Sequence, residues 1–191
     1  MPDTEEFQLT AQIAEFLRTR RFGKYRGLVT DVSDPEHVAR IKAQVPAIFG
    51  VEQDCPWAMP AVPFAGPQHG LVLLPEVGDG VWIEFEGGDL SRPIWTGCWW
   101  ARGQPPQPEG ETVRLLATKA GHQILIDEKA NEIKLVHPGG AEVKLGASEI
   151  SLKLGSCEFK ISATEVNINN GIVKVTTAGA SLFNDAFKVG A

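Results

Sequence analysis

The sequence of 191 residues has few cysteines and no long apolar run. Its 3 cysteines, Cys55, Cys98 and Cys157, lie far apart and form no CxxC pair, which argues against a disulfide framework and against a zinc site. Charge or glycine interrupts every apolar stretch well before the roughly 20 residues that a membrane-spanning helix needs. The acidic N-terminus lacks the basic-then-apolar layout of a signal peptide. We therefore expect a chain made in a cytosol, without a transmembrane helix.

Positive charge is also in short supply. The chain carries 18 Lys and Arg against 24 Asp and Glu, a formal charge of −6. This balance disfavours nucleic-acid binding, which depends on neutralising phosphates with cations. The 43% of hydrophobic and 22% of charged residues are ordinary for a folded protein, so material for a core is present.

The sequence has no recognisable catalytic or metal-binding set. Its only histidines, His37, His69, His122 and His137, show no ligand spacing. In a threefold assembly, three copies of His122 or of His137 could surround an ion, but a solvent-facing histidine is the default interpretation. We therefore predict no metal site and no cofactor.

Carboxylates are grouped at one place, between Asp79 and Asp89. In an alternating strand, Glu84 and Glu86 share the outward face, and Asp79 and Asp89 fall in turns, so a solvated rim is favoured over acid–base catalysis. No GxSxG elbow accompanies the serines. We therefore expect no enzymatic activity.

All 5 Trp lie before Pro108, and the pattern of this part of the chain predicts a helix followed by a small barrel. Residues 1–22 are assigned to a helical appendage, helical from Thr4 to about Arg21 with an incomplete apolar stripe. Residues 23–101 have short strands with turn punctuation and fit an OB-type barrel better than a sandwich. The expected strands are Arg26–Asp31, Ala39–Val45, Leu71–Leu74, Val81–Phe85 and Pro93–Trp100. Residues 102–111 are rich in proline and glycine and read as a linker.

From residue 112 the chain becomes a string of short alternating segments that ends in an internal repeat. The first segments are Gln123–Asp127, Glu132–Val136 and Glu142–Leu145. Beyond them, apolar residues recur seven positions apart, as from Leu154 to Ile161 (161 − 154 = 7). The residues of the repeat that are predicted to face inward are Leu152, Leu154, Phe159, Ile161, Val166, Ile168, Val173, Val175, Leu182, Phe187 and Val189.

The seven-residue step does not predict a coiled coil, because the apolar residues within each repeat are two and then five apart. Two residues on a helix are about 200° apart around the axis, whereas on a strand they share a face. Turn-forming pairs, Gly155-Ser156, Asn169-Asn170 and Asn184-Asp185, fall between the apolar pairs. Each unit is therefore predicted to be a short strand followed by a tight bend.

Two architectures satisfy this repeat. Intertwining with identical chains would give short strands partners on both edges and would close the apolar face around an axis, so we favour a homotrimeric β-prism over residues 112–191. The alternative is a single-chain β-solenoid with three seven-residue sides per coil. The number of bulky inward residues on each side favours the trimer.

Several segments together resemble the central spike proteins of contractile phage tails and related injection systems, of the baseplate assembly protein V and VgrG type. They are Tyr25–Val29, Ala39–Pro46, Pro56–Ala58, Leu73–Asp89 and Arg92–Gly97, followed by the β-repeat. The resemblance implies an all-β chain with an OB-fold barrel and an intertwined triple-stranded β-helix. It also implies a homotrimer that docks on the hub of the baseplate. Candidate residues for packing between barrels or against the hub are Trp57, Trp82, Trp95, Trp99 and Trp100.

The sequence departs from the family in two places. Some members carry a lysozyme domain between barrel and needle, where this chain has only the short linker. Others end in an HxH metal-binding tip, and here no histidine follows His137. We therefore expect neither muramidase activity nor a terminal iron site, and we expect a separate PAAR-like protein to cap the tip.

The function predicted from these features is that of a structural spike that punctures a target envelope when the sheath contracts. Its expected location is a virion tail baseplate or an injection particle assembled in the bacterial cytoplasm. The alternative is an OB-fold module that binds single-stranded nucleic acid or an oligosaccharide, with a solenoid tail.

Overall fold

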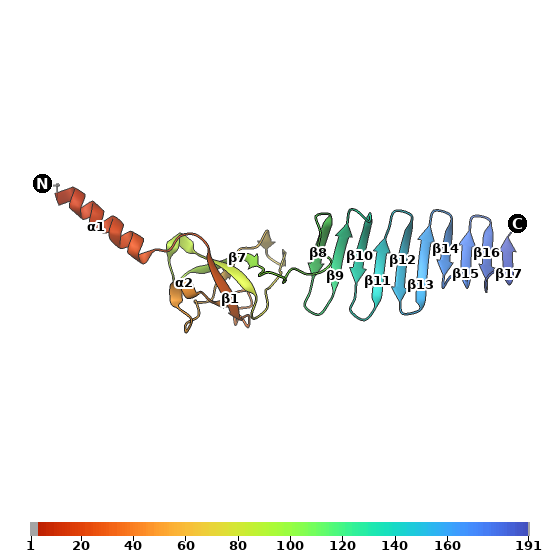
Figure 1. Ribbon diagram of the computed structural model, residues 1–191, viewed down its shortest axis with the longest axis horizontal. Helices are drawn as coiled ribbons and strands as arrows, with labels where there is room; N and C mark the ends of the chain where they lie inside the picture. Colours follow the sequence, from red (N-terminus) through yellow and green to blue (C-terminus); the bar gives the residue numbers. More distant parts are fainter. Residues whose placement is uncertain (1–3, 191) are drawn as a thin grey trace. The chain divides into compact units, whose positions relative to one another are not determined.

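The computed structural model describes residues 4–190, which form two compact units that meet between Gln104 and Pro105 (Figure 1). Helices and strands of the first unit alternate with long loops. No helix among the described residues is long and apolar enough to cross a membrane. The elements of the first unit are α1 (Thr4–Thr19), β1 (Tyr25–Asp31), β2 (Lys42–Gln44), α2 (Pro46–Phe49), β3 (Met59–Pro60), β4 (Ala65–Gly66), β5 (His69–Gly70), β6 (Gly80–Phe85), the 3-10 turn η1 (Glu86–Gly88) and β7 (Pro93–Trp99).

The barrel of this unit is built on one five-stranded sheet in the order β2-β1-β6-β7-β3. Strand β6 alternates as its sequence predicts, and Val81, Ile83 and Phe85 are buried while the residues between them are half-buried. Trp95 of β7 completes the core opposite these side chains. The remaining buried members of the cluster are Val29, Ile41, Ala43, Val45, Cys55 and Ala58.

Two expected barrel strands differ in the structure. Leu71–Leu74 forms no strand, and its four apolar side chains are exposed. The strand expected at Ala39–Val45 is reduced to Lys42–Gln44. Ala39 has a φ of 63°, which excludes it from an extended strand, Ile41 forms only an isolated bridge with Ala58, and Val45 is the N-cap of α2. Apolar or alternating patterns alone could not distinguish these loops from strands.

The second unit is one ten-stranded antiparallel sheet in which the strands follow each other in sequence order (Figure 1). The expected segments Gln123–Asp127 and Glu132–Val136 are strands with these bounds. Asn169, Asn170, Asn184 and Asp185 adopt positive φ in the bends, as short polar residues tolerate. The strands are β8 (Val113–Ala117), β9 (Gln123–Asp127), β10 (Glu132–Val136), β11 (Ala141–Leu145), β12 (Glu149–Leu154), β13 (Cys157–Ser162), β14 (Glu165–Ile168), β15 (Val173–Thr176), β16 (Gly179–Leu182) and β17 (Phe187–Gly190).

The pairing of these strands excludes the solenoid alternative. A three-sided coil would pair each strand with the one three positions further on, whereas here each strand pairs with the next. The same pairing also supplies the partners that the short strands were expected to find in other chains. Strands β9 to β16 have a neighbour on both edges within their own chain, so their ladders are complete without strands from another chain.

Candidate functional site

The strand register assembles two columns of side chains on one face of the ten-stranded sheet. Residues directly opposite each other in antiparallel strands share a face, so the columns follow from the pairs. The first column is Leu116, Ile124, Leu135, Val143, Leu152, Phe159, Ile168, Val173, Leu182 and Phe187. The second column is Arg114, Ile126, Ile133, Leu145, Ile150, Ile161, Val166, Val175, Ala180 and Val189.

This apolar face is uncovered in the single chain. Leu152 is 47% exposed and Val189 is 61% exposed, and the hollow over the middle of the face has a volume of about 600 Å³. Among the described residues of this unit, Leu125 is the only large apolar side chain that is fully buried. A sheet without a core is marginal in water, and an apolar patch of this extent is typical of an interface.

Every residue predicted for the axis lies on this face. Most belong to the two columns, and Leu154 lies beside them, paired with Cys157 and Ala141. The structure extends the columns back to β8, through residues such as Leu116, Ile124 and Ile133. The seven-residue step could not reveal them because it begins only later in the chain. That these residues pack about an axis remains a prediction.

The opposite face of the sheet is apolar at β8 and β9, where Leu115 and the buried Leu125 lie, and it is mainly polar from β10 onward. Its middle column includes Lys144, Ser151 and Lys160, and lysines of this face pair with acidic neighbours. Lys160 lies 3.1 Å from Glu158, and this hydrogen bond raises the pKa of the lysine. Such half-exposed pairs contribute little stability, but they keep the face hydrated. The two faces of the sheet are therefore chemically distinct. The other pairs are Lys134 with Glu132, Lys144 with Glu149 and Lys174 with Glu165.

The tryptophans proposed for docking fall into different environments. Trp95 is 5% exposed and its Nε1 donates to the carbonyl of Ala39 at 3.1 Å, so it belongs to the core and is not available for docking. Trp100 is 66% exposed. The sequence could not distinguish the buried Trp95 from the exposed Trp100, because both belong to the same expected strand, Pro93–Trp100.

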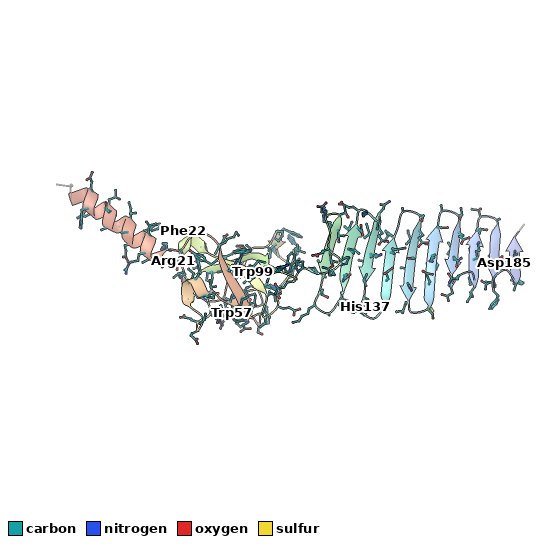
Figure 2. All side chains as sticks on the ribbon, viewed as in Figure 1. Arg21, Phe22, Trp57, Trp99, His137 and Asp185 are labelled. Atoms are coloured by element: carbon teal, nitrogen blue, oxygen red, sulfur yellow. The ribbon has the colours of Figure 1, made fainter. Side chains whose placement is uncertain are left out.

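The other three tryptophans are half-buried under cations. The Arg26 guanidinium lies 5.5 Å from the ring centre of Trp82 and 5.1 Å from that of Trp99. The Nζ atom of Lys42 lies 5.0 Å from the ring centre of Trp57, which is labelled with Trp99 in Figure 2. Tryptophan and arginine are enriched among the residues that contribute most binding energy in protein interfaces. These side chains remain the candidates for docking.

A buried ion pair orders the loop that follows β1. The Asp34 side chain is 4% exposed and accepts hydrogen bonds from Nε and Nη2 of Arg40 at 2.9 and 2.7 Å. Burial alone would raise the pKa of the Asp34 carboxyl. The hydrogen bonds from Arg40 and from the backbone N–H groups of Glu36, Val38 and Arg40 outweigh burial and hold this pKa below its usual range.

This lowered pKa predicts a pH-dependent barrel. Its stabilising effect is present above the unfolded-state pKa of roughly 3.9 and is lost as pH falls further toward the folded-state value. Asp34→Asn should lower the barrel melting temperature by about 5 °C or more at pH 7, and the difference from the wild type should shrink below about pH 4. Tryptophan fluorescence reports this transition because all 5 Trp lie in the first unit.

The exposed Glu52 provides a control, since Glu52→Gln should leave the melting temperature unchanged throughout. A difference between Asp34→Asn and the wild type that stays constant from pH 7 to pH 3 would contradict the assignment.

Known proteins match both units. Residues 25–100 match the type VI secretion system/phage-baseplate injector OB domain, and residues 113–174 match the phage baseplate V C-terminal trimerisation domain. The chain belongs to the spike family of phage baseplates and type VI injectors. This membership confirms the resemblance seen in the sequence and the OB assignment of the barrel.

A relative within this family is the actin cross-linking toxin VgrG1 of Vibrio cholerae serotype O1. It is 35% identical over 96 residues, which are 49% of this chain but 8% of the relative. The chain therefore spans a small part of that toxin. The second family match is more informative for the sheet, because a domain described by trimerisation coincides with the uncovered apolar face.

Proposed function

We propose that the chain is a homotrimeric structural spike at the centre of a contractile-tail baseplate. In this proposal three ten-stranded sheets turn their apolar faces toward a common axis and form a rigid needle. The observation that carries the proposal is the pair of apolar columns that runs across all ten strands and is exposed in the single chain.

The occupant of the apolar face is a set of further copies of the same chain. The family match supplies the number three, because it names a trimerisation domain. The polar face, with its paired lysines and carboxylates, would then form the outside of the needle. Three chains would carry a charge of 3 × −6 = −18, which keeps the assembled exterior soluble.

The two ends of the chain suit different partners. At the barrel end, the exposed Trp100 and the stack of Arg26 with Trp82 and Trp99 support docking on the baseplate hub. At the other end, β17 pairs only with β16 among the described residues. The free edge of β17 supports capping by a PAAR-like tip protein.

The needle is suited to transmitting thrust when the sheath contracts and the tip enters a target envelope. Continuous ladders leave few free strand edges from which the structure could unravel under load. We assign the chain this mechanical role and no enzymatic one. Within the family, the toxin activity named for VgrG1 is not carried over to this chain.

The alternative function, binding of single-stranded nucleic acid by the barrel, is not favoured by charge. Residues 1–104 hold 9 Lys and Arg against 14 Asp and Glu, a net charge of 9 − 14 = −5. A groove for nucleic acid is normally basic.

A complementation experiment tests the proposed role. A particle that lacks this chain should fail to deliver its contents into target cells, and the full chain should restore delivery. Residues 1–104 alone should not restore it, because they lack the needle. Restoration of delivery by the barrel alone would contradict a puncturing role for the sheet.

A further inference from the structure

Two histidines that are distant in the sequence lie together at one rim of the apolar face. His122 at the start of β9 and His137 after β10 have ring centres 4.9 Å apart and ring planes at 76° (His137 is labelled in Figure 2). His122 is two residues before Ile124, and His137 is two residues after Leu135. Both histidines therefore follow the apolar face in the alternation of the strands. Both side chains are exposed in the single chain.

The hydrogen bonds of the turn determine what His137 can bind. Its Nδ1 accepts from the backbone N–H of Gly139 at 2.9 Å, so the neutral ring carries its proton on Nε2. An Nε2–H group donates a hydrogen bond and has no lone pair for a metal ion. Nδ1 of His122 is likewise engaged, at 3.2 Å from Oγ1 of Thr118. The Nε2–H group of His137 therefore needs a hydrogen-bond acceptor as its partner.

Acceptors are concentrated at the opposite rim of the same two strands, in the turn from Asp127 to Glu132. The Asp127 carboxylate already accepts from the backbone of Lys129 and Ala130, and Glu132 pairs with Lys134. Glu128 is the least engaged of the three acidic residues. Its side chain is 58% exposed and lies 3.8 Å from Arg114.

Closed threefold symmetry brings these two rims together. A rotation without translation keeps every strand at the same height along the axis. The ends of β9 and β10 at one rim of a chain therefore meet the opposite ends of β9 and β10 in the next chain. At the height of β9 and β10, one rim holds Lys119 and two histidines and no carboxylate, and the other holds the acidic turn.

We propose that, in the trimer, the His122–His137 pair of each chain binds the Glu128 turn of the neighbouring chain, with the carboxylate accepting from the histidines. The trimer then contains three equivalent corner contacts, each made by residues of two chains. This inference rests on the proposed trimer.

Paired cysteines test the corner contact directly. In a chain with Cys98→Ser and Cys157→Ser, the combination Glu128→Cys with His137→Cys should form disulfides between chains when oxidised glutathione is added. The two positions cannot be bridged within one chain. They lie at opposite ends of five-residue strands, roughly 15 Å apart, whereas a disulfide needs Cα atoms within about 7 Å.

The expected product is a covalent trimer on a non-reducing denaturing gel, because each chain is linked to both neighbours. The control combines Glu128→Cys with Asn170→Cys, which lies on the same rim as His137 but four strands further along, roughly 20 Å away. This control should remain unlinked.

Light scattering on each variant separates the possible failures. A non-covalent trimer without interchain disulfides would overturn the corner contact and leave the proposed needle intact. Equal linkage in the Asn170→Cys control would also overturn it. A monomer in the unsubstituted chain would overturn the trimer and the contact together.

Discussion

Replacing Leu152 with Asp is expected to abolish trimer assembly and leave a monomer near the chain mass of 20.7 kDa. Leu152 lies in the first apolar column, in the hollow at the middle of the face. In the trimer, three carboxylates would be buried near the axis without partners. An uncompensated buried charge costs about 3–5 kcal/mol, and the three charges would also repel one another. Size exclusion with light scattering measures the outcome.

The neighbouring residue provides a matched control. Ser151 lies in the same strand on the opposite face, between Lys144 and Lys160 in the ladder. Ser151 is 6% exposed, but Ser151→Asp adds its charge between these two lysines, which can compensate it, so this variant should remain trimeric. A trimeric Leu152→Asp together with a dissociated Ser151→Asp would show that the two faces of the sheet have been assigned the wrong way round.

Trp95→Ala should destabilise the barrel by about 3–5 kcal/mol, the usual cost of removing a large aromatic side chain from a core. Trp95 packs in the barrel cluster and holds the carbonyl of Ala39 through its Nε1. Trp100→Ala should change the free energy of unfolding by no more than about 0.5 kcal/mol, because its side chain is 66% exposed. Urea unfolding followed by the fluorescence of the remaining tryptophans measures both changes.

Equal losses of stability in the two variants would contradict the division between a core and an exposed tryptophan. The same pair separates stability from docking. A loss of hub binding in Trp100→Ala, with an unchanged unfolding curve, is the result expected for a docking residue.

The sequence predicts many strands of this fold, because apolar and polar residues alternate regularly in strands that differ in polarity between their two faces. Alternation in β6 identifies Val81, Ile83 and Phe85 as core residues, and the structure buries all three. The seven-residue step identifies strands and bends from Leu152 onward, and the residues it selects share one face. A period of two is a strong signal when one face is apolar and the other charged.

The sequence fails where structure depends on contacts between distant segments. Leu71–Leu74 has the composition of a buried strand, yet it is an exposed loop. Ala39, the first residue of an expected strand, has a positive φ that the residue type does not predict. The adjacency of His122 and His137 arises from the pairing of β9 with β10, so four isolated histidines gave no ligand spacing to detect.

The mass of the unsubstituted chain in solution tests the central claim most directly. Light scattering after size exclusion should give a trimer of 3 × 20.7 = 62.1 kDa, because the sheet has an exposed apolar face and residues 113–174 match a trimerisation domain. A stable, folded monomer of 20.7 kDa would contradict the account.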